Sequence, residues 1–290
     1  MTEEDFTPEN GAAPRARVSV AGVVLTPIAL LGRKTLHTLD HIGAIMALQW
    51  EASLWVWRAV TRRKVRIGKA ALVSQLVRVG VQSVLIVSLV AGAVGLILAL
   101  QLAPPLDGFG QRDKLANIIG VAVLRELGPL IGAIVLTGFA GASIAAEIGT
   151  MVVSEEVEAL EAHALNPVRF LVVPRLAAAT VSMTLLGVLS SFTAIAAALL
   201  ISMTVLGIPF ETYMDNTLAQ AKLVDFLTGT AKSAIFGMLI GIIACTNGLK
   251  VSGGAAGVGR ATTYTVVECV VAIVVADLIF TAIFFALKLN

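Results

Sequence analysis

Five stretches of this 290-residue chain are each long enough and apolar enough to cross a lipid bilayer. A spanning helix needs about 20 apolar residues, and here 57% of the residues are hydrophobic, only 14% are charged and the mean hydropathy is +0.91. Because a backbone in lipid must satisfy its own hydrogen bonds, these stretches are expected to be helices. The sequence predicts an all-α integral membrane protein with spans at about 79–105, 115–146, 176–208, 224–249 and 265–287.

The residues before the first span divide into two parts. Residues 1–17 are polar and lack the apolar core of a signal peptide, so we expect a disordered cytoplasmic tail. Residues 18–78 have helical apolar periodicity, but charges interrupt it too often for a span, and the segment ends in tryptophans and a basic run at 62–69. This pattern predicts an amphipathic elbow helix at the level of the lipid headgroups. A helix packed on the remainder, 79–290, is the alternative.

The basic residues predict the orientation. With a cytoplasmic N-terminus, the inner segments 1–78, 147–175 and 249–264 carry fifteen Lys and Arg residues, and the outer segments carry four. Positive residues concentrate on the cytoplasmic side of membrane proteins. Five spans then place the C-terminus outside the cytoplasm.

Several ionisable residues fall inside the predicted spans. Arg125 and Glu126 lie in the second span and Lys232 in the fourth, while Glu268 and Asp277 lie in the fifth. Charges at this depth are costly and usually mark a substrate or ion path. Sequence neighbours on a helix point about 100° apart, so Arg125 and Glu126 need different partners. Lys232 is expected to bind an anionic headgroup or to pair with Glu126, and a purely structural ion network remains an alternative.

An acidic segment separates the second and third spans. Ser154 is a candidate N-cap for a short amphipathic helix at about 153–164, and glutamates occupy its first turn. The exposed acidic face either docks a soluble partner or is simply solvated.

The chain lacks the motifs of several other functions. No Walker A loop is present, so any nucleotide hydrolysis belongs to another chain. His37 and His41 lack a third metal ligand, and Cys245 and Cys269 have no zinc-ligand spacing. We therefore predict no catalytic residue, no metal, no cofactor and no nucleic-acid partner. Glycines spaced four apart, such as Gly128 and Gly132, predict close helix packing, within the chain or at a dimer seam.

Several motifs in order resemble the MlaE/YrbE family of permeases, over about residues 69–285. They are RELGP at 125–129, AAEIGTM at 145–151, EEVEAL at 155–160, NP at 166–167, VPR at 173–175, GVGRATT at 257–263, and Asp277. The family comprises membrane subunits of ABC transporters that move phospholipids or related lipids between the inner and outer membranes of bacteria.

The resemblance implies partners and site residues. It implies an inner-membrane homodimer with a lipid pocket open to the periplasm, a cytoplasmic ATPase, a periplasmic MCE-domain protein and, in some systems, a STAS-domain protein. It carries substrate contacts onto Arg125, Glu126, Lys232 and Leu98. It also carries ATPase coupling onto Glu155, Glu156, Glu158, Leu160 and Glu161. Phe139 stands where the family commonly has arginine, which puts the contacts near it in doubt.

Two rival functions come from other classes. One is a secondary transporter driven by protons through Glu126, Glu268 and Asp277. The other is a membrane scaffold without a lipid pocket. The missing nucleotide motif and the acidic helix favour the ABC permease over both.

Overall fold

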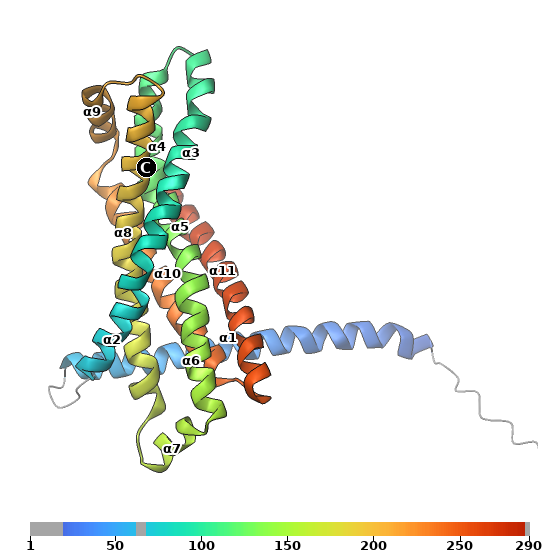
Figure 1. Ribbon diagram of the computed structural model, residues 1–290. Helices are drawn as coiled ribbons and strands as arrows, with labels where there is room; N and C mark the ends of the chain where they lie inside the picture. The colour runs from blue at the N-terminus through green and yellow to red at the C-terminus, as the bar shows by residue number, and fades with distance from the viewer. Residues whose placement is uncertain (1–19, 62–67, 288–290) are drawn as a thin grey trace, which may run out of the picture. The chain divides into compact units, whose positions relative to one another are not determined.

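The computed structural model describes residues 20–61 and 68–287, and all of its regular structure is helical (Figure 1). The chain forms two units, 1–44 and 45–290, and every membrane span lies in the second. The predicted tail at 1–17 lies outside the described residues.

Eleven α-helices and five shorter helical segments follow one another in the described part of the chain. The α-helices are α1 (Val20–Thr61), α2 (Lys69–Val79), α3 (Val84–Gly108), α4 (Leu115–Ala122), α5 (Gly128–Leu136), α6 (Ala142–Val153), α7 (Glu156–Ala162), α8 (Val173–Thr204), α9 (Phe210–Gln220), α10 (Leu223–Leu249) and α11 (Gly254–Ala286). The short segments are the 3₁₀ turns η1 (Val81–Ser83) and η2 (Arg112–Lys114) and the π-helices η3 (Val123–Leu127), η4 (Thr137–Gly141) and η5 (Val168–Val172).

These segments join into five candidate membrane spans, as predicted. The spans are Ala70–Gly108, Arg112–Val153, Val168–Thr204, Leu223–Leu249 and Gly254–Ala286. They run up and down in turn, with α7 at one end of the bundle and α9 at the other (Figure 1). We call these the α7 end and the α9 end.

The span boundaries differ from the sequence prediction in four of the five spans. The first begins earlier, at Ala70, and does not stop at Pro104 and Pro105, because α3 continues through both to Gly108. Each of these prolines lacks the N–H that would donate to the carbonyl four residues earlier, so α3 cannot form those two bonds. The second span continues to Val153. The third span begins earlier, in η5, and ends at Thr204. The fifth begins at Gly254, so the glycines of 253–259 start a helix instead of a loop.

Two of the three π-helices in the described residues end just before a proline. η3 ends two residues before Pro129, and η5 ends two residues before Pro174. A proline has no backbone N–H for the carbonyl four residues earlier, so the helix widens there. The ion-carrying turn at Arg125 and Glu126 is therefore part of a locally irregular helix.

Glycines allow the spans to approach closely. A Cβ on Gly229 of α10 would lie 2.0 Å from the carbonyl oxygen of Leu124, and one on Gly237 would lie 2.6 Å from that of Ala179. Gly128 is similarly packed against Ser191 of α8. Small residues at such crossings let helix backbones touch. These glycines thus pack the bundle internally, whereas Gly138 has open space beside it.

Helix α9 lies between the third and fourth spans, where the sequence analysis predicts no helix. It is fixed on α4 by the fully buried Tyr213 and by Asn216, whose Nδ2 donates to the carbonyl oxygen of Asp113 at 2.9 Å. Burial raises the pKa of Tyr213 to about 12, which keeps its phenol neutral. The helix is thereby held as a wall at the α9 end.

Candidate functional site

The deepest charge in the bundle is Lys232 of α10, whose side chain is 0% exposed. Its Nζ forms an ion pair with Glu126 Oε2 of η3 and lies 2.9 Å from Asp277 Oδ1 of α11. Nζ also donates to Thr281 Oγ1 at 3.2 Å. We call Lys232, Glu126, Asp277 and Thr281 the Lys232 cluster. It joins three spans through charge-assisted hydrogen bonds.

Arg125 turns away from this cluster, which confirms that the two neighbours need different partners. Its Nη1 lies 3.7 Å from Asp225 Oδ1 in the first turn of α10. Asp225 Oδ2 also accepts a hydrogen bond from the backbone N–H of Lys222 at 3.0 Å, so it caps α10. A second ionic link therefore fixes η3 against the start of α10.

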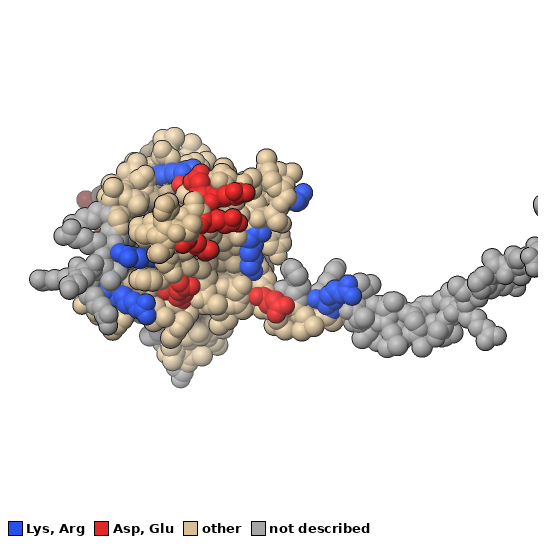
Figure 2. All heavy atoms as spheres, turned by 90° about the horizontal axis from the view of Figure 1, so that it is seen from below, with Lys and Arg blue, Asp and Glu red and all other residues tan. Residues whose placement is uncertain are grey.

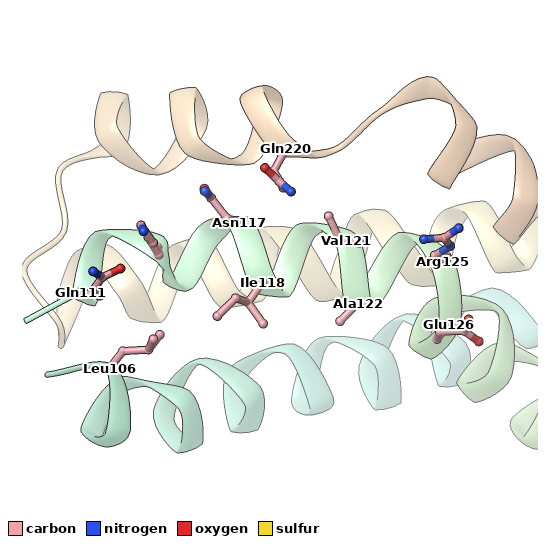
Figure 3. A pocket seen from close by; sticks show the side chains of 10 residues that line it. Leu106, Gln111, Asn117, Ile118, Val121, Ala122, Arg125, Glu126 and Gln220 are labelled. Carbon is pink, nitrogen blue, oxygen red and sulfur yellow. The ribbon is translucent and has the colours of Figure 1, made fainter. Parts of the chain in front are cut away.

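A cavity of about 840 Å³ opens between these elements and the α9 end. Arg125 and Glu126 lie at one end of it, and Gln220 from α9 faces α4 across it (Figure 3). The lining residues are Leu106, Gln111, Lys114, Asn117, Ile118, Val121, Ala122, Arg125, Glu126 and Gln220. Its volume is in the range of small-molecule sites. We call it the α4 cavity.

Two of the four predicted substrate contacts lie at this cavity. Arg125 and Glu126 line it, with side chains 14% and 30% exposed. Lys232 is enclosed behind Glu126 and is not part of the lining. Leu98 of α3 packs on the neighbouring apolar core and does not line it either. Direct contact of Lys232 or Leu98 with substrate stays a prediction.

The sequence reasoning missed other members of the lining. Lys114, Asn117 and Gln220 line the cavity but are not among the predicted site residues. Lys114, Asn117, Val121 and Arg125 recur every three to four residues, which on one helix gives a single face. That spacing could have identified them.

The three acids named for a proton path do not lie together. Glu126 and Asp277 share Lys232, but Glu268 accepts a hydrogen bond from Asn247 Nδ2 at 2.8 Å. Glu268 is nine residues before Asp277 on α11, which is about 13 Å along a helix. The arrangement gives no support to a continuous relay through all three.

A second ionic group lies toward the α7 end. Glu147 of α6 accepts from Arg175 Nη2 of α8 at 2.8 Å and from Arg78 Nη1 of α2 at 3.0 Å. Arg175 also donates to the carbonyl oxygen of Leu171 at 2.8 Å. We call Arg78, Glu147 and Arg175 the Glu147 cluster. The sequence places Glu147 in the acidic segment and in the AAEIGTM motif, but it does not indicate the two arginine partners.

The acidic helix α7 projects at its end of the bundle and is short. Ser154 is not its N-cap: Ser154 ends α6, and its Oγ donates to the carbonyl oxygen of Thr150 at 3.0 Å. Glu155 takes the N-cap position with φ 61°. Glu155, Glu156, Glu158 and Glu161 are exposed, while Leu160 is partly buried. Acidic residues gather on the face seen from this end (Figure 2).

Comparison with known proteins gives one consistent family. The model of the family described as "Permease MlaE" matches residues 72–283. A probable ABC transporter permease protein of Rickettsia prowazekii is 33% identical over 88% of this chain and 96% of its own length. Another, from Synechocystis, is 34% identical over 73% of this chain and 81% of its own length. The chloroplastic protein TRIGALACTOSYLDIACYLGLYCEROL 1 of Arabidopsis thaliana is 31% identical over 82% of this chain and 71% of its own length.

Proposed function

Because the chain belongs to the MlaE permease family, and so is the membrane subunit of an ABC transporter and not itself an ATPase, we propose that it moves phospholipids or related lipids between the inner and outer membranes of a bacterium. The α4 cavity is the observation that carries the proposal. It combines cationic side chains with an apolar wall, which suits a ligand with a charged headgroup and apolar tails. The name of the Arabidopsis relative, which contains that of a lipid, agrees with this substrate class.

In this proposal Arg125 holds the lipid phosphate. An arginine offers a planar set of donors that matches phosphate oxygens. Asp225 orients the guanidinium, and Glu126 borders the site while Lys232 and Thr281 fix its carboxylate. Lys232 thus acts as a positioning residue. The lipid tails lie along the apolar side of the cavity.

The proposed assembly follows the family. Two permease copies pair with a cytoplasmic ATPase and a periplasmic MCE-domain protein, and a STAS-domain protein joins in some systems. The exposed glutamates of α7 meet the ATPase, so that ATP-driven movement reaches the spans through α6 and α8. This places the α7 end in the cytoplasm and the α9 end in the periplasm of an inner-membrane protein, in agreement with the distribution of Lys and Arg.

The substrate role is tested at Arg125. Arg125→Gln alone leaves Asp225 buried without its charge partner, so the double variant Arg125→Gln/Asp225→Asn is the better probe. We expect it to fold and to lose about tenfold or more of the lipid that co-purifies with the permease–ATPase complex, as quantified by mass spectrometry. Arg112→Gln, on a surface pair with Asp107, is the matched control. Wild-type lipid content and transport in the folded double variant would overturn the role.

The coupling role is tested at α7. Charge reversal of Glu155, Glu156 and Glu158 to lysine should reduce the ATPase recovered with the permease by about tenfold, because like charges then face the partner's basic surface. Glu211→Lys, in the first turn of α9, changes charge at the other end and should have no effect. Unchanged ATPase recovery in the reversed variant would remove α7 from the interface.

A further inference from the structure

We propose that the α4 cavity selects a lipid whose headgroup is anionic and rich in hydroxyls over a lipid with a zwitterionic amine headgroup. The inference rests on the proposed function and adds the substrate class. It depends on the overall charge of the lining and on its amide side chains, of which the proposed function assigns only Arg125 to the lipid phosphate.

The charges of the lining residues disfavour the binding of a headgroup ammonium. Two cations, Lys114 and Arg125, and one carboxylate, Glu126, line the cavity. That carboxylate is already paired with Lys232 and accepts from Thr281. Asp225 is paired with Arg125 and caps α10. An ammonium would have to compete for occupied oxygens, whereas a second negative or neutral polar group meets an excess of positive charge.

The amide side chains suit hydroxyl groups. Gln111, Asn117 and Gln220 also line the cavity, and an amide can donate to and accept from hydroxyls. Asn117 Oδ1 is buried yet finds no hydrogen-bond donor among the described residues. A buried acceptor left unpaired costs free energy. Because the Asn117 side chain lines the cavity, a turn of its amide would let a ligand hydroxyl donate to this oxygen. Asn117 and Gln220 approach the cavity from α4 and from the α9 side (Figure 3).

The two sides of α4 differ in polarity, so one suits the lipid headgroup and the other suits the tails. Asn117 and Arg125 lie toward α9 and the start of α10, while Ile118 and Ala122 lie on the side of Leu106 at the end of α3 (Figure 3). Leu106, Ile118 and Ala122 form an apolar strip, and Ile118 is 44% exposed. A soluble glycerophosphodiester would leave this strip uncovered, so the tailed lipid is the ligand that the cavity fits.

The test uses the purified permease–ATPase complex and lipids with identical acyl chains. Native mass spectrometry compares phosphatidylglycerol with phosphatidylmethanol, which has the same charge but no headgroup hydroxyls, and with phosphatidylethanolamine. We expect phosphatidylglycerol to bind about fivefold more tightly than phosphatidylmethanol. Phosphatidylmethanol should in turn bind at least about fivefold more tightly than phosphatidylethanolamine. Tail-free glycerophosphoglycerol should not compete. If it competes as well as the lipid, the ligand is the free phosphodiester.

Variants assign each preference to its residues. Asn117→Leu and Gln220→Leu should bring phosphatidylglycerol down to the level of phosphatidylmethanol, while Gln101→Leu, on α3 outside the lining, should not. Lys114→Gln should weaken both anionic lipids equally, and Lys250→Gln, near the α7 end, should weaken neither.

The outcomes separate this inference from the proposed function. Equal binding of phosphatidylglycerol and phosphatidylmethanol overturns the hydroxyl preference, and equal binding of phosphatidylethanolamine overturns the charge preference. In both cases the proposed function stands if Arg125→Gln/Asp225→Asn still loses lipid. If that double variant binds every lipid as the wild type does, the proposed function fails as well.

Discussion

The Lys232 cluster and the Glu147 cluster are built with opposite charges. In the first, a cation lies between two carboxylates, and in the second, a carboxylate lies between two arginines. Each joins three elements: η3, α10 and α11 in one, and α2, α6 and α8 in the other. The clusters differ most in the exposure of the central side chain, which is 0% for Lys232 and 29% for Glu147.

This difference separates two kinds of ionic link. Among the described residues, oxygens of Glu126, Asp277 and Thr281 hold Lys232 Nζ, and the ring of Phe284 lies 5.7 Å from it. Glu147 borders a cavity of about 510 Å³ near the α7 end. Water therefore reaches the central carboxylate of the second cluster, whereas in the first it reaches Glu126 at the α4 cavity but not the central ammonium. The links to Glu147 are better screened and cost less to break. We infer that the Lys232 cluster fixes the spans beside the α4 cavity, and that the Glu147 cluster is the more easily rearranged joint.

The largest expected effect is that of Lys232→Met. It leaves two carboxylates facing each other without their cation, and breaking a buried pair in this way costs about 3–5 kcal/mol of the free energy of unfolding. We expect a large drop in Tm in detergent, or loss of folded protein. Thermal unfolding followed by size-exclusion chromatography measures it.

A neutral version of the same cluster is the control for Lys232→Met. The triple variant Lys232→Met/Glu126→Gln/Asp277→Asn removes all three charges, so no unpaired ion remains. It should recover a large part of the lost stability, because a neutral cluster has no desolvated charge to offset. A Lys232→Met protein as stable as the wild type would show that the two clusters do not differ as argued.

Glu147→Gln should have the next largest effect. It removes the charge that faces Arg175, a residue only 5% exposed whose Nε already has no hydrogen-bond partner within the described chain. Partial exposure of Glu147 keeps the expected loss to about 1–3 kcal/mol. The same unfolding assay measures it. A loss equal to that of Lys232→Met would contradict the contrast in solvent access.

The spans and the in-membrane charges were predictable from the sequence because both depend on composition over about 20 residues. Their pairing was only partly predictable. The pairing of Lys232 with Glu126 was one of two predicted possibilities. The additional pairing of Lys232 with Asp277 depends on how α11 crosses α10, and no local sequence pattern fixes that crossing. Arg125 with Asp225 was missed for the same reason.

The boundaries and the small helices were predicted less well. Helix α9 is held by the burial of Tyr213 against α4, and the mostly polar sequence of α9 does not predict this tertiary contact. Gly253 and Gly254 at the start of α11 have φ values of 84° and 66°, which glycine adopts without strain, so these glycines set where the helix begins. Ser154 is a residue type that favours the N-cap position, but α6 extends to Val153 and makes Ser154 its C-cap instead.

Thr281→Val tests the Lys232 cluster without removing a charge. The Thr281 hydroxyl accepts from Lys232 Nζ at 3.2 Å and donates to Glu126 at 3.3 Å, and valine keeps the shape of the side chain. We expect a loss of about 1 kcal/mol of unfolding free energy, together with reduced lipid co-purification, because Glu126 at the cavity is less well fixed. Thr262→Val, an exposed threonine at the start of α11, is the matched control. Equal effects of the two variants would contradict a specific role of Thr281.

The smallest effect is expected for Arg78→Gln, and it divides the Glu147 cluster internally. The Arg78 side chain is 45% exposed, whereas that of Arg175 is 7% exposed, although both reach the same carboxylate. An exposed ion pair contributes about 0–1 kcal/mol and weakens with salt. Arg78→Gln should therefore lower stability by less than Arg175→Gln at low salt and have almost no effect at about 1 M salt, where the Debye length falls to about 3 Å. Thermal unfolding of both variants across a salt series measures this. If Arg78→Gln costs as much as Arg175→Gln at high salt, the joint at the α7 end is as tightly held as the Lys232 cluster, and the difference between the two clusters lies in charge alone.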